Sequence, residues 1–449
     1  MVFITLVILA ICLYIWNYKI SALVIFFFFL TSGFDMVPEE IMTNALFSKG
    51  MDYAIFIIVG IIIVDSVCIK NYWKPDKLLW VIIIFYIFLA LCVIYNRYVI
   101  GVGWKDIIRT IRYNVLWAAY LIFRKLPKER LLELLKYLFL ITVFCSILFI
   151  LQIFLNEHIL NETSKSSIEM FGMKLPRFYN QPDMLLFFTF MAVYFNPYNG
   201  IFKITTTAIL VMALLGAFHR GLLIAFIAAI SIAYIIRLPR LRRIVVLTSV
   251  SILSLFFIIF YGYKFANSRT IIDISTVLSG NVTSLEAGDI DIEDLQNSTF
   301  TFRIFHLLER NLYILDHPKA MLFGAGLMSE DSKLTDSMFN FDIGVIEEAL
   351  DRTAQIDTAD ISYSILLLRY GYLGTLLVLS LYIFFMVYFY KNHKNPIGLF
   401  SFAYFIVAMI VSFSSSVLVM PVTFLLPLIT YNIVKKNKDE NKFTKEFSS

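Results

Sequence analysis

The chain has 449 residues, of which 59% are hydrophobic and only 16% charged, and its formal net charge at pH 7 is +5. Soluble domains carry about 25% charged residues, so this composition excludes an ordinary water-soluble shell. A net charge this small gives no indication of a nucleic-acid partner. We therefore interpret the chain as an integral membrane protein whose solvent is a lipid bilayer.

Apolar runs recur along the chain at lengths that suit the roughly 30 Å hydrocarbon core of a bilayer. Helices satisfy their own backbone hydrogen bonds in hydrocarbon, so each run is predicted to be a helix. The fold class is therefore an all-α polytopic membrane protein with about 12–13 transmembrane helices. The predicted spans are residues 2–16, 20–35, 53–69, 78–96, 107–123, 131–154, 184–196, 201–218, 221–236, 244–262, 363–390, 397–415 and 416–433.

Lys and Arg in the short connections predict the orientation of these spans. They cluster at 70–77, 124–130, 237–243, 391–394 and 435–445, and alternation through the spans places every cluster on one side. By the positive-inside rule this side is cytoplasmic, which puts the C-terminus inside and, for an odd span count, the N-terminus outside.

The spans divide the chain into four parts. Residues 1–262 are predicted to form the N-terminal membrane helices, 263–362 a large extracytoplasmic loop, 363–434 the C-terminal membrane helices and 435–449 a basic cytoplasmic tail. The loop holds seventeen Asp and Glu against seven Lys and Arg. An amphipathic helix is predicted within it near 302–315, and a loop of this size with its own helix is more typical of a functional element than of a connector.

Several arginines fall at the outer boundary of the membrane, where cations should be scarce. Headgroup anchoring explains any single one, because long basic side chains reach the interface readily. Arg109 and Arg369, however, are predicted to lie inside spans, where a charge is costly and usually functional. Guanidinium groups match phosphate oxygens in a bidentate manner, so the set predicts a site for a lipid-linked phosphate or diphosphate. The candidates are Arg109, Arg112, Arg177, Arg220, Arg303, Arg310 and Arg369.

Three stretches of the chain resemble the bacterial O-antigen polymerase and O-antigen ligase superfamily. They are the Arg-Gly turn in FHRGLLIAF, the loop helix and glycine pair in TFRIFHLLERNLYILDHPKAMLFGAGL, and DISYSILLLRYGYLG, which leads from the loop into the next span. Their order matches across about residues 170–390, whereas the first 150 residues match only in topology. His219 departs from the usual serine before Arg-Gly. Asp360-Ile361 stands where ligases often have His-Asn, which favours a polymerase.

The resemblance implies a membrane glycosyltransferase of the bacterial inner membrane with its active face in the periplasm. It would join repeat units of O-antigen, capsule or exopolysaccharide, with donor and acceptor glycans both carried on undecaprenyl diphosphate. A chain-length regulator protein is a further partner that the resemblance leaves open. Arg177, Arg220 and Arg303 are the first choices for holding the diphosphate.

The reaction also needs a base for the incoming sugar hydroxyl. Asp360 is the leading candidate, although its place before the eleventh span also suits a helix N-cap. The remaining candidates are His306, His317, Asp357 and Glu347. No metal or cofactor is required by this scheme, since arginines can neutralise the leaving diphosphate.

Two other classes stay open. A ligase would use the same donor site but transfer the finished glycan to a lipid A core or a protein. A lipid-linked glycan flippase would bind the same lipid, but it should carry inverted repeats and ionisable residues along a midplane cavity. The sequence shows no internal repeat, and its intramembrane charges lie near the ends of the spans.

Overall fold

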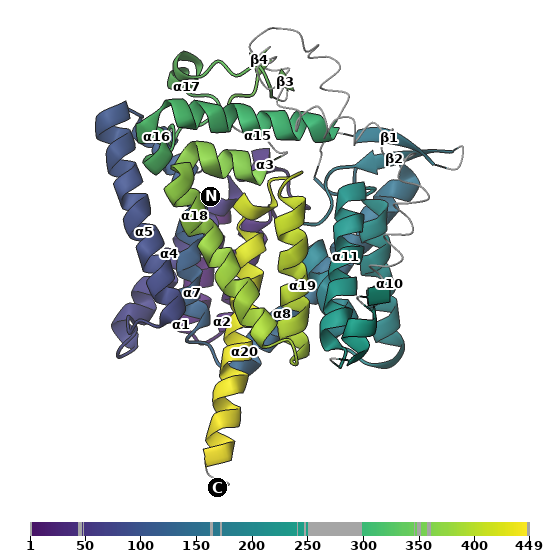
Figure 1. Cartoon of the computed structure of the whole chain (residues 1–449). Coiled ribbons are helices and arrows are strands. Elements are labelled where there is room, and N and C mark those ends of the chain that lie inside the picture. The colour runs from purple at the N-terminus through teal and green to yellow at the C-terminus, as the bar shows by residue number, and fades with distance from the viewer. Residues whose placement is uncertain are drawn as a thin grey trace.

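The chain forms a bundle of long helices with a cap of shorter elements across one end, as the computed structural model shows (Figure 1). Its helices follow the apolar runs of the sequence, and its strands, within the part described, form two short antiparallel hairpins. The structure describes residues 2–43, 47, 49–161, 165–170, 173–239, 241–246, 248–249, 299–344, 346–347, 352–356 and 361–446.

The elements follow the chain in three groups. The first comprises α1 (Val2–Ile15), α2 (Lys19–Leu30), α3 (Glu39–Met42), α4 (Gly50–Cys68), α5 (Lys77–Tyr95), the π-helical turn η1 (Asn96–Ile100), α6 (Trp104–Val115), the 3-10 turn η2 (Leu116–Ala118), α7 (Ala119–Phe123) and α8 (Lys128–Leu155). The second comprises β1 (Lys165–Met170), β2 (Met173–Phe178), α9 (Leu185–Tyr194), α10 (Gly200–Gly216) and α11 (Arg220–Arg237). The third comprises α15 (Thr299–Asp316), α16 (Pro318–Phe323), α17 (Lys333–Met338), β3 (Ile346–Glu347), β4 (Arg352–Thr353), α18 (Ser362–Lys391), α19 (Pro396–Val411), the 3-10 turn η4 (Val417–Val419) and α20 (Val422–Glu446).

Four helices among the described residues are long and apolar enough to cross a membrane: α4, the continuous helix Lys77–Ile100, α8 and α18. Shorter apolar helices pack beside them. Helices lie in the predicted spans; of the tenth, 244–262, the structure describes only 244–246 and 248–249, which are helical. This arrangement fits a membrane protein.

The structure differs from the sequence prediction at several places. The thirteenth span was predicted to end at 433, but α20 runs on to Glu446, so most of the basic tail is helical. The hairpin of β1 and β2, which pairs Lys165 with Phe178, was not predicted. Its short strands are polar, so they lack the apolar alternation that indicates a half-buried strand.

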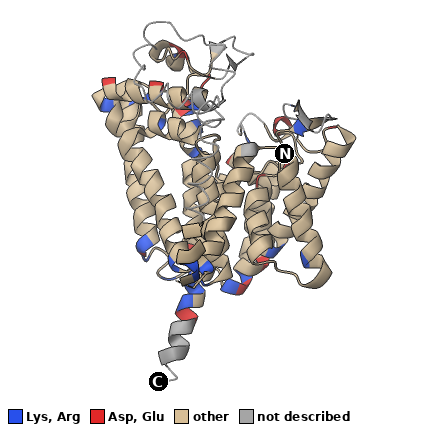
Figure 2. Ribbon diagram, turned by 45° about the vertical axis from the view of Figure 1, so that its right-hand side comes forward, with Lys and Arg blue, Asp and Glu red and all other residues tan. Residues whose placement is uncertain are grey.

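Basic connections that are far apart in the sequence meet at one end of the bundle. Lys435 of α20 pairs with Asp76 at 2.8 Å, and Lys128 pairs with Glu440 at 2.8 Å. Arg124 donates to the carbonyl oxygen of Lys74 at 2.9 Å. Figure 2 shows Lys and Arg gathered at this end, from which the C-terminal helix projects. The membrane face that this end occupies stays a prediction.

The opposite end is covered by α15, which lies across the tops of the long helices (Figure 1). It matches the amphipathic helix predicted near 302–315 and begins three residues earlier, at Thr299. Its apolar residues pack on α16 and α18. The cap therefore packs directly on α18, the long helix that follows it in the chain.

The two glycine motifs FGAGL and RYGYLG pack against each other beneath this cap. Gly371 interrupts α18 with a φ of 64° and ψ of −169°, and Gly324 has a φ of 77°. A Cβ at Gly324 would overlap the carbonyl oxygen of Arg369. The N–H of Ala325 donates to the carbonyl oxygen of Leu368 at 2.7 Å, a carbonyl that the kink frees from the helix. Glycine is needed at both positions, because these φ values favour it and the backbones are in contact.

Candidate functional site

A cavity of about 550 Å³ lies between α6, the first half of α18 and the segment that joins α19 to α20. Ser329, Glu330 and Asp331 of the cap and Lys49 at the N-cap of α4 complete its wall. Its walls thus come from segments that are hundreds of residues apart in the chain.

One part of the cavity wall is cationic. Its basic residues are Lys49, Arg109, Arg112 and Arg369. Arg109 and Arg112 lie three residues apart on α6 and so share a face of that helix. Arg369 reaches the same cavity from α18, two residues before the kink at Gly371. The fold therefore gathers cations from three helices.

The two arginines of α6 are held in different ways. The Nη1 group of Arg112 donates to both carboxylate oxygens of Asp52, at 3.1 and 3.2 Å, and Arg112 is buried. This pair offsets the cost of placing a charge inside the bundle. Arg109 pairs with Asp331 at 3.3 Å, with 66% of the Asp331 side chain exposed. An exposed pair of this kind is weak, so Arg109 can exchange partners readily.

Another part of the cavity wall is apolar and aromatic. The rings of Trp117 and Phe424 stack with their centroids 4.0 Å apart. Tyr382 donates its hydroxyl to the carbonyl oxygen of Leu418 at 2.6 Å, so its polar end is already satisfied. The cavity is lined here by the side chains of Trp117, Val378, Tyr382, Leu418 and Phe424. The cavity thus combines cations with a surface suited to hydrocarbon.

The cap segment at the cavity is fastened to the membrane helices by several hydrogen bonds. Leu327 donates its N–H to the Oδ1 atom of Asn96 at 2.7 Å. Asp106 of α6 accepts hydrogen bonds from the hydroxyls of Ser329 at 2.7 Å and Ser332 at 3.2 Å. These bonds lie on both sides of Glu330 and Asp331, so that pair is held in place at the cavity.

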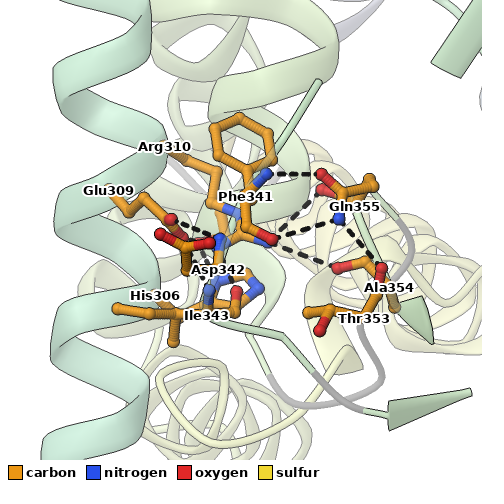
Figure 3. Close-up of polar contacts among 10 residues, drawn as sticks. His306, Glu309, Arg310, Phe341, Asp342, Ile343, Thr353, Ala354 and Gln355 are labelled. Carbon is orange, nitrogen blue, oxygen red and sulfur yellow. Dashed lines mark hydrogen bonds and ion pairs between the residues drawn. The ribbon is translucent and has the colours of Figure 1, made fainter. Parts of the chain in front are cut away.

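A second polar cluster stabilises the cap without reaching the cavity (Figure 3). Arg310 of α15 is buried and donates to Glu309, to the carbonyl oxygen of Ile343 and to that of Ala354 at 3.3 Å. Its guanidinium lies over the ring of Phe341, 4.3 Å from the centroid. Burial lowers the pKa of Arg310 to about 10 and raises that of Glu309.

Arg310 was a predicted diphosphate ligand, and the structure places it in this polar cluster of the cap instead. Arg310 does not line the cavity. Its donors are directed to groups of the cap itself, namely a neighbouring carboxylate and backbone carbonyls. Arg303, His306 and Arg310 do share one face of α15, as predicted, and at His306 and Arg310 that face is turned inward.

The two candidate histidines are placed differently. His306 is buried, and its Nδ1 atom lies 2.9 Å from the hydroxyl oxygen of Ser364 in α18. Burial and the charge of Arg310 lower its pKa to about 2, so the ring is neutral at physiological pH. His317 is exposed, stacks on Tyr313 and has its Nδ1 atom 2.8 Å from the Tyr313 carbonyl oxygen. Neither histidine lines the cavity.

The remaining predicted arginines lie on other elements. Arg177, on β2, stacks on the ring of Tyr179 with 4.6 Å between the guanidinium carbon and the ring centroid. Arg303 lies in the first turns of α15, and Arg177 and Arg303 are not among the residues lining the cavity. Arg220 begins α11, but its side chain is outside the described part of the chain.

The predicted acidic candidates fall largely outside the described residues. Asp357 and Asp360 lie there entirely, and only the backbone of Glu347 is described, in β3. The N-cap of α18 is Ile361, directly after Asp360 in the chain, and the two roles predicted for Asp360 lie outside the described residues.

The sequence prediction did not include Lys49, Glu330 or Asp331 in the site. Glu330 and Asp331 follow FGAGL closely, but the prediction used that glycine pair as part of the family resemblance and assigned no role to the acidic residues after it. The packing of FGAGL on RYGYLG is what brings this acidic pair to Arg369. The signal in the sequence that could have indicated this site was RYGYLG, in which Arg369 lies two residues before Gly371.

No protein-family model matches this chain, and no curated protein matches it significantly. The resemblance to the O-antigen polymerase and ligase superfamily is therefore carried by short motifs alone. Two of these motifs, FGAGL and RYGYLG, are in direct backbone contact beside the cavity.

Proposed function

We propose that this protein is a membrane glycosyltransferase that joins lipid-linked oligosaccharide repeat units. The observation that carries the proposal is the cavity that combines Lys49, Arg109, Arg112 and Arg369 with an aromatic inner wall. A ligand with an anionic head and a hydrocarbon tail fits such a surface on both counts. Undecaprenyl diphosphate, which the sequence resemblance implies, is an amphiphile of this kind.

The cations suit a diphosphate better than they suit a neutral headgroup. Guanidinium groups donate two parallel hydrogen bonds to phosphate oxygens, and these bonds strengthen where water is excluded. Two of the arginines approach from α6 and one from α18, so a diphosphate between them would be contacted from both sides. The aromatic wall formed by Trp117 and Phe424 would then receive the first units of the lipid chain.

The proposed reaction is a single group transfer. The hydroxyl oxygen of the acceptor sugar attacks the anomeric carbon of the donor glycan, and the bond from that carbon to the diphosphate oxygen breaks. The electron pair of that bond leaves with the lipid diphosphate, whose growing charge the arginines stabilise. The hydroxyl proton passes to a carboxylate of the cap. The donor glycan is thereby joined to the acceptor, which remains on its own lipid.

The test is a reaction with purified protein in lipid vesicles and an undecaprenyl-diphosphate-linked repeat unit as substrate. We expect a ladder of polymers, resolved by length on a gel. Arg369→Ala should reduce turnover by about 10²–10³, the usual effect of removing one transition-state donor. Arg369→Lys should recover only part of this loss, because an ammonium cannot reproduce the two parallel bonds.

The matched control is Arg130→Ala, an exposed arginine paired with Glu133 at the opposite end of the bundle. It should leave the polymer ladder unchanged. Movement of the lipid across the vesicle membrane without any new glycosidic bond would support a flippase. Transfer of the glycan only to a lipid A core or protein acceptor would support a ligase, and either result would overturn the polymerase proposal.

A further inference from the structure

Two carboxylates of the described residues line the cavity, and they are adjacent in the chain. Glu330 is buried, and its Oε1 and Oε2 atoms accept the backbone N–H groups of Gln355 and Ile356, each at 2.8 Å. Both of its oxygens are thus occupied in fastening the segment Gln355–Ile356 of the cap to the cavity wall. Glu330 is therefore suited to a structural role.

Asp331 has the opposite character. Its side chain is 66% exposed, and its Oδ2 atom accepts a hydrogen bond from Nη1 of Arg109 at 3.3 Å. Its backbone is nevertheless held on both sides, because Ser329 and Ser332 donate to Asp106 of α6. Asp331 is thus an accessible carboxylate on a fixed backbone, beside the cations of the cavity.

We infer that Asp331 is the general base of the transfer reaction and that the donor lipid releases it by taking over Arg109. The inference rests on the proposed function. A diphosphate carries more charge than a carboxylate, so it competes effectively for the guanidinium of Arg109. Asp331 then lies beside the bound donor without its ion partner.

The step is balanced within the proposed reaction. The Oδ atom of Asp331 accepts the proton of the acceptor hydroxyl while the hydroxyl oxygen bonds to the anomeric carbon. The bond from that carbon to the diphosphate oxygen breaks, and its electron pair leaves with the lipid diphosphate. The proton returns to water when the product leaves. Exchange of the ion pair also couples the availability of the base to donor binding.

The experiment measures kcat and KM for Asp331→Asn with purified lipid-linked repeat units. Asparagine keeps the size and hydrogen-bonding oxygen of the side chain but loses its basicity and its charge. We expect kcat to fall by about 10²–10⁴, the usual contribution of general base catalysis. KM for the donor should stay the same or fall, because Arg109 no longer has a competing anion. A purely structural role would not lower kcat and KM together.

Asp316→Asn is the matched control, because Asp316 is an exposed aspartate on the cap helix α15 that does not line the cavity. It should leave both constants unchanged. A wild-type kcat in Asp331→Asn, with activity still abolished by Arg369→Ala, would overturn the inference and leave the proposed function intact. Loss of kcat in Asp360→Asn but not in Asp331→Asn would assign the base to Asp360. Absence of product from the wild-type protein would overturn both proposals.

Discussion

Arginines that the sequence placed in one predicted diphosphate site have different roles in this molecule. Their surroundings determine the role of each. Arg310 is buried among backbone carbonyls and a neighbouring carboxylate, so its donors hold the cap together. Arg112 is buried against Asp52, whereas Arg109 lies in an exposed pair. The sequence indicated that these charges matter, but it could not distinguish them, because their partners are distant in the chain. The burial of an arginine and the identity of its partner, rather than its residue type, decide whether it can bind a ligand or instead stabilises the fold.

The buried histidine of the cap predicts a specific pH dependence. His306 has a pKa of about 2 in the folded protein, whereas an unfolded histidine titrates near 6.5. Below about pH 6.5 the unfolded state therefore binds a proton that the folded state does not, and folding becomes less favourable. We expect His306 to destabilise the cap by about 1 kcal/mol at pH 5.5 relative to neutral pH.

Thermal unfolding of wild type and His306→Gln at pH 7.5 and 5.5 measures this effect. The variant should lose less stability on acidification than the wild type. His317→Gln serves as the control, since His317 is an exposed histidine of the same cap. Equal acid sensitivity in wild type and His306→Gln would show that the pKa of His306 is not depressed.

At the scale of elements, the kink of α18 depends on close backbone packing. A Cβ at Gly371 would lie 2.5 Å from the carbonyl oxygen of Ala320, and its φ of 64° is strained for any L side chain. Gly371→Ala should therefore destabilise the fold by more than the roughly 1–3 kcal/mol that a sparsely populated backbone conformation costs by itself. It should also weaken donor binding, because Arg369 lies two residues away.

Gly200→Ala separates the two contributions to this effect. Gly200 has a comparable φ of 61°, but a Cβ there would meet nothing within 4 Å. Its alanine variant should show the cost of a positive φ without steric overlap when thermal unfolding of both variants is compared. Equal losses of stability would mean that the packing of FGAGL on RYGYLG contributes nothing.

The predictable elements are those whose signal is local. The spans could be predicted because the bilayer requires about 20 apolar residues in sequence, and the amphipathic pattern identified α15. The kink at Gly371 could not be predicted, because it requires Gly324 from another segment. The hairpin of β1 and β2 was missed because its strands are short and polar. The boundary of α20 was wrong because a helix can continue into water once charged residues replace apolar ones.

At the scale of the whole molecule, the site is assembled from α4, α6, the cap and α18. Of the seven arginines predicted from the sequence, Arg109, Arg112 and Arg369 line one cavity, whereas Arg177 and Arg303 do not. The first choices, Arg177, Arg220 and Arg303, were named from their positions along the chain, which do not report proximity in space. Proximity here follows from the way α6 and α18 pack beneath the cap. The acidic residues that complete the site come from the cap segment held by Asp106 and Asn96.

The central claim is that this cavity holds the diphosphate of a lipid. Binding of undecaprenyl diphosphate without sugar to the purified protein tests it most directly, since no catalysis is needed. We expect Arg369→Ala to weaken binding by about 10–100-fold, the effect of losing a charge-assisted hydrogen bond, and Arg130→Ala to leave it unchanged. Unchanged binding by Arg369→Ala together with loss of binding by Arg177→Ala would contradict the claim.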